Sequence, residues 1–399
     1  MKKLKPPHPF PARMAPEIAI KKLNDLTANS VVLDPMAGSG TVLRHAAEVG
    51  HVAIGFDTDP LARLMARVWT TPIDTKKVRD LAEQVVKAAK ATSINRSRLN
   101  WHCSRETEDY VNFWFGSKQS RDLRRLAHRL DIFRRKFRLH DDIANVDCLR
   151  LALSKLIITK ENGASLARDI SHSRPHKVMD QSDFDVFPAF LKAVERLTKE
   201  LEKHPPPGQV SVRKGDARRL DLPNNSIDCV ITSPPYLNAI DYMRGHRLSL
   251  VWLGYSLDVL REIRQKSVGT ERGIDSAVLL EEFRKILNEL GDTNHLPSRY
   301  QRMILRYIHD IYTMMSEVRR VLKYGSTATI VVGNSCLKGI FIKNSECVKQ
   351  AADMVGLALS SECERNIPLQ SRYLPPPESG LSPLGKRMRT ESILEFVRN

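Results

Sequence analysis

The fold is decided by residues 31–41, which read Val-Val-Leu-Asp-Pro-Met-Ala-Gly-Ser-Gly-Thr. An apolar run is followed here by a loop with two glycines, then by a helical stretch and by a second apolar run that ends in Asp57. Glycines let a loop turn tightly and bring its backbone close to a ligand, and the helix that follows points its N-terminus at the same place. This order of strand, loop, helix, strand and acid predicts one half of an open α/β sheet that binds a nucleoside.

The residues of this loop favour a cationic ligand over a polyphosphate. Asp34 opens the loop and no lysine closes it, and neither G-x-G-x-x-G nor G-x-x-x-x-G-K-[ST] is present. Asp57 follows the loop by roughly 20 residues, where an acid accepts hydrogen bonds from ribose hydroxyls. S-adenosylmethionine combines a nucleoside with a cation, so we expect it as the cofactor.

A second feature is the tetrapeptide Ser233-Pro234-Pro235-Tyr236, which ends the apolar run 227–232. The run predicts a buried strand whose carboxyl end opens onto the ligand crevice of the sheet. The two prolines leave carbonyl groups without backbone donors, Ser233 adds a hydroxyl acceptor, and Tyr236 offers a ring on which a flipped base can stack. The tetrapeptide predicts a clamp for a nucleobase amine; taken alone, an ordinary turn explains it as well.

The two segments resemble the cofactor loop and the catalytic motif of S-adenosylmethionine-dependent amino-methyltransferases. The serine form of the clamp resembles that of N4-cytosine DNA enzymes, whereas Asp or Asn at its first position is more usual in N6-adenine enzymes. Three further segments fall in the order of that family: residues 8–17 resemble its N-terminal cofactor motif, 215–217 the turn after its third strand, and 387–396 its last strand.

The resemblance implies a site-specific DNA methyltransferase that acts directly on the exocyclic N4 amine of a cytosine flipped out of double-stranded DNA. Positioning and electrostatics would supply the rate, and no metal is expected. The expected catalytic residues are Ser233, Pro234, Pro235 and Tyr236. The expected cofactor contacts are Phe10, Pro11, Asp34, Pro35, Gly38, Ser39, Gly40, Thr41, Asp57, Asp216 and Ala217. A C5-cytosine mechanism needs a cysteine nucleophile, usually in a Pro-Cys pair, and no such pair occurs; Cys229 is expected in the core.

Composition agrees with a nucleic-acid partner. The 399 residues carry a formal net charge of +17, which predicts a polyanionic partner, and double-stranded DNA is the simplest choice. The six cysteines are scattered, so neither a zinc site nor a disulfide framework is indicated. No apolar stretch is long enough to cross a bilayer, and a cytoplasmic, nucleoid-associated protein is expected.

We expect an α/β protein with a Rossmann-like seven-stranded methyltransferase sheet, helices on both faces, and a largely helical insert. Residues 1–72 form the cofactor-binding part, 73–208 a basic helical insert for target recognition, and 209–399 the catalytic part, with a substrate-cleft insertion at about 240–300. A long helix over residues 298–323 is predicted to end at Tyr324-Gly325, before a strand over residues 327–333.

One segment of the insert, residues 121–138, is both amphipathic and basic. Its apolar residues have helical spacing, and arginines occupy its other faces. Such a helix can lie along a phosphate backbone, although an ordinary packed helix with a solvated charged face has the same pattern. The expected DNA contacts are Arg124, Arg125, Arg134 and Arg135, with Arg244 and Arg247 after the clamp.

Other functions remain open at this point. A DNA N6-adenine methyltransferase and an RNA base methyltransferase can share this cofactor loop, and a non-catalytic nucleic-acid-binding protein can share the fold. The intact loop and clamp favour an enzyme. The sequence leaves open the DNA recognition sequence, a separately acting restriction endonuclease and the oligomeric state.

Overall fold

The computed structural model describes residues 4–10, 14–137, 139–159, 162–168, 175–207, 209–237, 242–268, 280–367 and 390–399. Its strands, in chain order, are β1 (Val31–Asp34), β2 (Val52–Asp57), β3 (Ala167–Arg168), β4 (His176–Lys177), β5 (Val210–Lys214), β6 (Ile227–Thr232), β7 (Leu322–Gly333), β8 (Ser335–Leu337), β9 (Ile340–Ile342), β10 (Ala358–Asn366) and β11 (Thr390–Val397). Its α-helices are α1 (Pro16–Asn24), α2 (Thr41–Glu48), α3 (Pro60–Thr70), α4 (Thr75–Ala91), α5 (Arg105–Trp114), α6 (Ser117–Lys136), α7 (His140–Ser154), α8 (Val186–Lys203), α9 (Tyr242–Leu250), α10 (Leu257–Gln265), α11 (Leu280–Glu289), α12 (Ser298–Val321) and α13 (Asn344–Met354), with three 3-10 turns, η1 (Ile94–Arg96), η2 (Val251–Leu253) and η3 (Thr293–His295).

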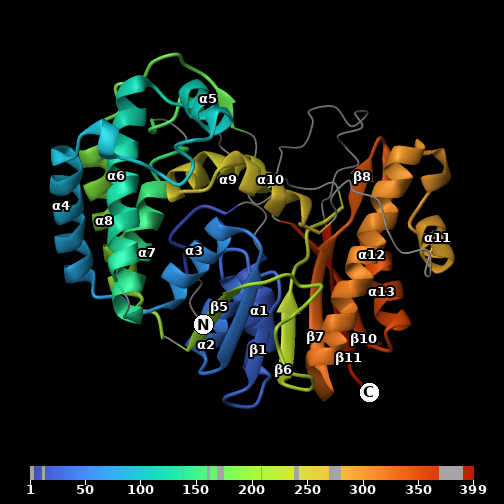
Figure 1. The fold of residues 1–399 in the computed structure, drawn as a ribbon. Coiled ribbons are helices and arrows are strands. Elements are labelled where there is room, and N and C mark those ends of the chain that lie inside the picture. Colours follow the sequence, from blue (N-terminus) through green and yellow to red (C-terminus); the bar gives the residue numbers. More distant parts are fainter. Residues whose placement is uncertain are drawn as a thin grey trace.

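Seven strands form one sheet in the order β10-β11-β7-β6-β1-β2-β5 (Figure 1). Neighbouring strands are parallel except that β11 runs antiparallel to both β7 and β10. The chain turns back across the sheet between β1 and β6, and the carboxyl ends of two such strands border the crevice in which open α/β sheets bind ligands. The predicted seven-stranded α/β sheet is confirmed.

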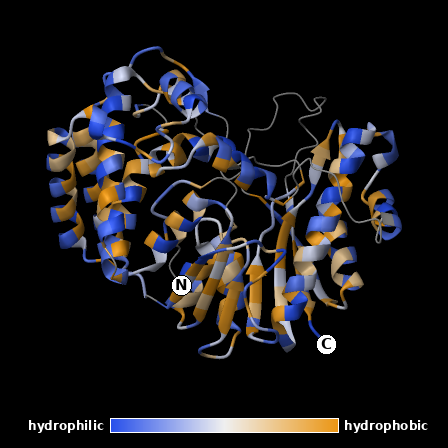
Figure 2. Ribbon diagram, in the orientation of Figure 1, coloured by the Kyte–Doolittle hydropathy of each residue, from blue (hydrophilic) through white to orange (hydrophobic). Residues whose placement is uncertain are grey.

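Helices cover both faces of the sheet, as predicted. Val32 and Ile231 belong to an apolar cluster with α1 and α2, whereas Leu33 and Val230 belong to another with α12 and α13. Successive side chains of a strand point to opposite faces, so adjacent residues enter different clusters. Figure 2 shows the apolar strands between these helical layers.

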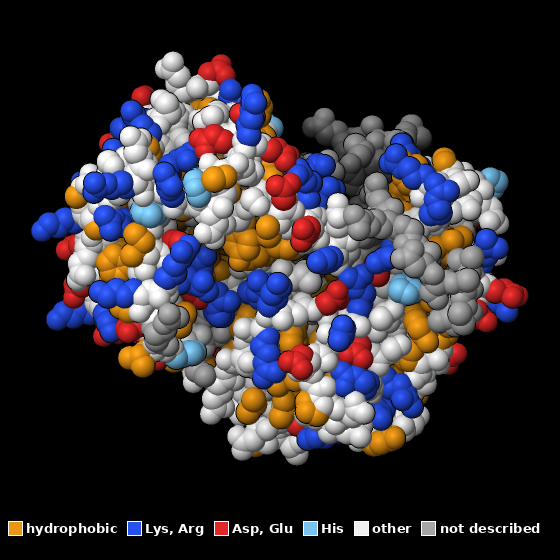
Figure 3. All heavy atoms as spheres, viewed as in Figure 1, with side chains coloured by type: hydrophobic (Ala, Val, Ile, Leu, Met, Phe, Trp, Pro, Cys, Tyr) orange, Lys and Arg blue, Asp and Glu red, His pale blue; other side chains and the backbone are white. Residues whose placement is uncertain are grey.

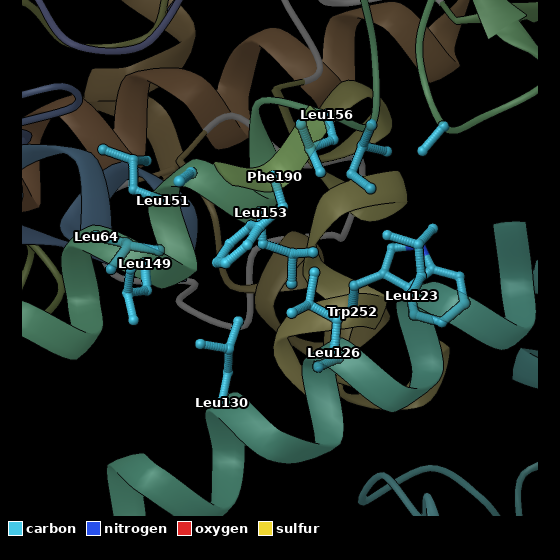
Figure 4. Packing of buried hydrophobic residues seen from close by; sticks show 14 of the residues in the cluster. Leu64, Leu123, Leu126, Leu130, Leu149, Leu151, Leu153, Leu156, Phe190 and Trp252 are labelled. Carbon is cyan, nitrogen blue, oxygen red and sulfur yellow. The ribbon is translucent and has the colours of Figure 1, made fainter. Parts of the chain in front are cut away.

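Helices α4 to α8 form a bundle beside the sheet, here called the helical lobe (Figure 1). Its apolar interior includes Leu123 and Leu130 of α6 (Figure 4). Leu64 of α3 and Trp252 of η2 join the same cluster, so the lobe shares its core with elements outside residues 73–208. The insert is largely helical, as expected, and its boundaries at 72 and 208 stay a prediction.

Arg44 of α2 joins the two ends of the helical lobe to the rest of the molecule. Its side chain is buried, and Nη1 donates to the carbonyl oxygen of Trp69 at 2.6 Å. Nη2 donates to the carbonyl oxygens of His204 at 2.9 Å and Pro205 at 3.3 Å. Trp69 lies near the end of α3, before the lobe, and His204 follows its last helix. One buried guanidinium therefore fixes where the chain leaves the sheet layer and where it returns.

The predicted stop at Tyr324-Gly325 is wrong. Helix α12 ends at Val321 and the chain passes directly into β7, which begins at Leu322. The strand tolerates the extra residues because its register with β6 shifts: Ile227 pairs with Leu322, but Cys229 pairs with Thr327. A helix-stop signal and a strand irregularity both use a glycine with positive φ, and the sequence does not distinguish them.

Candidate active site

The cofactor loop and the clamp lie next to each other at the centre of the sheet. The loop begins with Asp34 at the end of β1, and the clamp follows Thr232 at the end of β6. The Thr232 hydroxyl donates to Oδ1 of Asp34 at 2.7 Å, and both residues are buried. Two motifs about 200 residues apart in the chain are thus joined by one hydrogen bond between neighbouring parallel strands.

The glycine loop is held by the acid at the end of β2. The backbone N–H of Gly38 donates to Oδ2 of Asp57 at 2.8 Å, and Gly38 has a φ of +51°. A Cβ at Gly38 would stand 3.1 Å from the ring of Phe10, so the loop and the N-terminal segment approach closely. A Cβ at Gly40 would stand 3.0 Å from the Cα of Ala66 in α3, which explains the second glycine. The loop, Asp57 and Phe10 therefore lie together, as the expected cofactor site requires.

Burial changes the acidity of both carboxyl groups at this site. Desolvation raises the pKa of Asp34 to about 7, although hydrogen bonds from Thr232 and the Met36 backbone oppose it. Desolvation, followed by the charge of Asp59, raises the pKa of Asp57 to about 6. Because burial disfavours the ionised carboxylate, a cation placed here would regain part of that free energy.

The start of α2 holds two hydroxyl groups that lack partners among the described residues. Ser39 Oγ and Thr41 Oγ1 are buried and make no hydrogen bond there. Buried polar atoms in folded proteins are rarely left without partners. Together with the raised carboxyl pKa values, these hydroxyls fit a ligand that is cationic and rich in hydrogen-bonding groups, as an amino-acid cation with a nucleoside is.

The turn after β5 places Asp216 beside Arg218, whose side chain is partly buried. Asp216 accepts hydrogen bonds from the Arg218 side chain, with Nη2 at 2.7 Å, and Arg218 also donates to Asp310 of α12 at 2.6 Å. The neighbouring Ala217 is buried. The expected contact of Asp216 with an adenine amine stays a prediction, and it would have to use lone pairs that Arg218 leaves over. Arg218, two residues after Asp216, was not among the residues expected from the sequence.

The clamp has a defined internal geometry. The Ser233 hydroxyl donates to the carbonyl oxygen of Val331 in β7 at 2.9 Å and lies 3.5 Å from the Tyr236 hydroxyl. Pro234 is buried, whereas Pro235 and Tyr236 are partly exposed. Burial also raises the pKa of Tyr236 to about 12, so its phenol stays neutral.

Two residues that support the clamp, Ser335 and Asn344, were not among those expected from the sequence. Ser335, the first residue of β8, donates to the carbonyl oxygen of Leu237 at 2.6 Å, just after the clamp. Asn344 at the start of α13 donates to Ser335 Oγ at 2.7 Å and to the carbonyl oxygen of Gly333 at 2.8 Å. Isolated Ser and Asn residues carry no sequence signal for such contacts.

Another overlooked contact ties the segment after the clamp to the cofactor side. His246 of α9 lies 2.5 Å, from Nδ1 to Oδ2, from Asp59, which caps the start of α3. The ring centroids of His246 and Phe10 are 5.7 Å apart. The sequence Asp59-Pro60 indicates the start of a capped helix. Nothing in the sequence indicates that His246 of α9 is the partner of Asp59.

Helix α6 confirms the predicted amphipathic helix and shows how its arginines are used. Arg124 is largely buried, with Nη2 2.6 Å from Glu108 and its guanidinium 4.9 Å from the Trp101 ring centroid. Arg125 pairs with Asp122 at 3.7 Å, and the more exposed Arg134 and Arg135 pair with Asp147 and Asp131. Their contact with DNA stays a prediction, and the structure separates the packed arginines from the exposed ones.

The remaining expected residues have different surroundings. Arg244 of α9 is exposed, whereas Arg247 is partly buried with its guanidinium 5.7 Å from the Tyr110 ring centroid. Pro35 is buried behind the glycine loop. Pro11 lies outside the described residues.

Within the part of the chain that the structure describes, no group of three or more His, Cys, Asp and Glu residues is arranged to hold a metal ion. No helix within the same ranges combines the length and apolar character needed to cross a membrane.

Comparison with curated proteins finds methyltransferases. The type II methyltransferase M.MvaI of Kocuria varians is 23% identical over 420 residues, covering 98% of this chain and 90% of that protein. The type II methyltransferase M.AvaI of Nostoc sp. is 29% identical over 146 residues, which cover 32% of this chain and 30% of that protein. The chain is therefore similar, at low identity, to type II methyltransferases, and to the first of them along almost its whole length.

Two further comparisons add little. No family model matches the chain. Among solved structures, a TehB-like S-adenosylmethionine-dependent methyltransferase from Corynebacterium glutamicum is 9% identical, with a TM-score of 0.30 over 96% of this chain and 88% of that one. At such a low score, the fold assignment depends on the strand order and not on this likeness.

Proposed function

We propose that this chain is an S-adenosylmethionine-dependent DNA methyltransferase that modifies the N4 amine of cytosine in double-stranded DNA. The observation that carries the proposal is the hydrogen bond between Thr232 and Asp34. It joins the residue before the amine clamp to the first residue of the cofactor loop, so a methyl donor and an amine acceptor bound at the two motifs would meet.

The residues around the glycine loop fit the methyl donor. Asp34 and Asp57 favour a cation, and Phe10 lies against Gly38. Ser39 and Thr41 offer hydroxyls that have no partner among the described residues. When bound, S-adenosylmethionine supplies a methyl group on a positively charged sulfur. These side chains bind and orient it, and their burial excludes water from the reacting atoms.

The clamp acts on the amine. An exocyclic amine is a poor nucleophile because its lone pair is delocalised into the ring. Ser233 already gives its hydrogen to Val331, so its oxygen faces a base as an acceptor. Acceptance of the amine hydrogens by Ser233 Oγ and the Pro234 carbonyl draws the nitrogen toward tetrahedral geometry. The nitrogen would take the methyl group that S-adenosylmethionine supplies as the bond from that group to sulfur breaks. It would then lose one proton, which reaches water when the product leaves the site.

The choice of base is the finer part of the proposal. The serine form of the clamp supports cytosine. The Ser233 hydroxyl could donate to the ring nitrogen of cytosine only after it gave up its hydrogen bond to Val331. Such a donation therefore does not contribute to the preference for cytosine over adenine. An N6-adenine product is therefore the main alternative, because adenine presents a similar amine and ring-nitrogen edge.

The helical lobe and the residues after the clamp would bind the DNA. The net charge of +17 favours a polyanion, and homology to type II methyltransferases supports double-stranded DNA as the substrate. We assign target recognition to the helical lobe, which flanks the sheet (Figure 1).

The decisive experiment is methyl transfer from tritiated S-adenosylmethionine to double-stranded DNA, followed by nucleoside mass spectrometry. N4-methylcytosine is the expected product. N6-methyladenine would overturn the base assignment alone, and 5-methylcytosine would overturn the direct mechanism. Transfer to RNA but not to DNA would replace the substrate, and binding of DNA without any transfer would indicate a non-catalytic protein.

A further inference from the structure

Three arginines surround one buried carboxylate where the helical lobe meets the sheet layer. Asp147 of α7 is 2% exposed. Its Oδ2 lies 2.8 Å from Nε of Arg67 in α3, and its Oδ1 lies 3.3 Å from Nη1 of Arg150 and 3.8 Å from Nε of Arg134 in α6. We call these three residues the arginine cluster. It takes one member from the sheet layer and two from the lobe.

The charges in this cluster do not balance. Burial raises the pKa of Asp147, but the charges of Arg67 and Arg150 outweigh burial, and its pKa lies below the ordinary value. Asp147 is therefore ionised, and it is one negative charge among three positive ones. A single arginine is enough to neutralise a buried carboxylate, so a structural ion pair does not explain the other two.

Two of the three guanidinium groups keep donors free. Within the described ranges, Arg67 uses only Nε in a hydrogen bond, and Arg134 makes none. Their side chains are 31% and 45% exposed. Arg150 is more buried and donates to the carbonyl oxygen of Leu253. Arg67 and Arg134 thus approach opposite oxygens of one carboxylate, and both side chains are partly exposed to solvent.

The cluster lies beside the candidate active site. Arg63, one helical turn before Arg67 on α3, donates from Nη1 to the carbonyl oxygens of Asp57 and Thr58 at 2.8 Å each. Asp57 is the residue expected to hold the cofactor ribose. Figure 3 shows Lys and Arg side chains gathered over the face where the lobe meets the rest of the molecule.

From this geometry we propose that Arg67 and Arg134, both held by Asp147, bind one phosphodiester group of the DNA backbone. The inference rests on the proposed function, because it names the surface by which that enzyme holds its substrate. Guanidinium groups suit the purpose because they match phosphate oxygens in pairs and always carry charge. A phosphate bridged between α3 and α6 would fix the lobe and the sheet layer to the same point of the duplex.

Arg79 provides a matched control. Its side chain is 34% exposed, close to that of Arg67, but it faces two acids, with Glu202 at 2.8 Å and Glu195 at 3.9 Å. Replacement of Arg79 by glutamine removes the same charge from a site where positive charge is not in excess.

The test compares Arg134→Gln, the double variant Arg67→Gln/Arg134→Gln and Arg79→Gln with the unchanged protein. DNA affinity is measured by fluorescence anisotropy on duplexes of two unrelated sequences across a range of salt concentrations. Arg134→Gln keeps both hydrogen bonds of Asp147, so it tests the idea even if the double variant folds poorly. Thermal unfolding and calorimetric titration with S-adenosylmethionine show whether each variant is intact.

The double variant should lower the slope of log affinity against log salt by about one, the loss of a single phosphate contact, equally on both duplexes. Affinity should fall roughly tenfold near physiological salt, with cofactor affinity unchanged and Arg79→Gln like the unchanged protein. Equal slopes in all variants, or an equal loss in Arg79→Gln, would overturn the site. Inorganic phosphate at millimolar concentration should compete only weakly with labelled DNA for the protein. Competition by phosphate as strong as competition by unlabelled DNA would indicate a site for free anions instead.

These results separate the inference from the function on which it rests. If the unchanged protein methylates DNA and the variants keep its salt slope, only the proposed role of the arginine cluster is refuted. If the unchanged protein binds S-adenosylmethionine but no DNA, both this role and the proposed function are refuted. Preferential binding of RNA duplexes by the cluster would also overturn the proposal.

Discussion

The hydroxyl group of Ser233 donates its hydrogen to the carbonyl oxygen of Val331 on the adjacent strand β7, at 2.9 Å. A serine hydroxyl has one hydrogen and two lone pairs. With the hydrogen already engaged, the oxygen is presented as an acceptor only, and its rotation is restrained. In the proposed mechanism, this fixed acceptor would be in place before a substrate binds, which is the condition for effective electrostatic catalysis.

Replacement of Ser233 by alanine should lower the single-turnover rate of methyl transfer by about 100-fold and change DNA affinity little. The lost hydrogen bond matters most as the amine nitrogen becomes tetrahedral. Ser226→Ala is a matched control, because the Ser226 hydroxyl also donates to a backbone carbonyl, that of Pro223, at 2.7 Å but before the start of β6. An equal effect of both variants, or a Ser233 effect on affinity alone, would contradict the role.

Tyr236→Ala should impair base flipping, whereas Tyr236→Phe should retain most of the activity. The ring provides a stacking surface worth about 1 to 3 kcal/mol per base, and the hydroxyl lies only at 3.5 Å from Ser233. Fluorescence of 2-aminopurine at the target position reports flipping directly. Tyr324→Ala, at an exposed tyrosine of β7, serves as the control. Loss of flipping in Tyr236→Phe would shift the role from the ring to the hydroxyl.

The affinity for S-adenosylmethionine should rise between pH 6 and pH 8. Burial raises the pKa of Asp34 to about 7 and that of Asp57 to about 6, so the two carboxylates that favour a cation form in this range. Calorimetric titrations at several pH values measure the effect. Asp34→Asn should weaken binding and flatten its pH dependence, while Asp228→Asn, at the opposite end of β6, should leave the pH dependence unchanged.

The same groups affect the stability of the protein without cofactor. An unfolded aspartate has a pKa of about 3.9, so between about pH 4 and pH 7 the folded chain holds more protons at Asp34 and Asp57 than the unfolded chain does. Their contribution to the unfolding free energy therefore falls as pH rises through this window. Thermal unfolding of the Asp34→Asn variant should lack part of this decline; a decline identical to that of the unchanged protein would contradict the assignment.

Arg124 and Arg135 on α6 should respond differently to alanine. Arg124 is packed against Trp101 and paired with Glu108, so its loss should cost about 2 kcal/mol of unfolding free energy, measured with urea. Arg135 is mostly exposed, so its loss should cost less than about 0.5 kcal/mol and weaken DNA binding at all sequences. The reverse pattern would mean that the helix presents its other face to DNA.

The sequence was sufficient to predict the individual strands and the two motifs because the signals for them are local. Apolar runs of β-branched residues predicted β1 and β6, and the glycine loop predicted the crossover between β1 and β2. The position of the clamp beside the loop followed from the rule that ligands bind where strand order reverses. Each of these inferences needed only a few neighbouring residues.

The contacts that complete the site are not local, and no short pattern announces them. Asp59 and His246 are 187 positions apart, and Arg218 reaches Asp310 on a helix 92 positions away. The use of Arg124 as a packed residue also depended on where α5 placed Glu108. Side-chain partners of this kind follow from the packing of α9, α12 and the helical lobe, which the residues alone do not specify.

The two ends of the helical lobe meet at Arg44, and this has a consequence for how such a protein can change. The first lobe helix and the last are also joined directly, since Thr75 donates to Glu202 at 2.6 Å. A segment whose ends are neighbours can be lengthened or shortened with little displacement of the strands on either side. On the proposed role of the lobe in target recognition, chains of this architecture can therefore change their target sequence within one contiguous stretch, provided that it keeps the core it shares with α3 and η2.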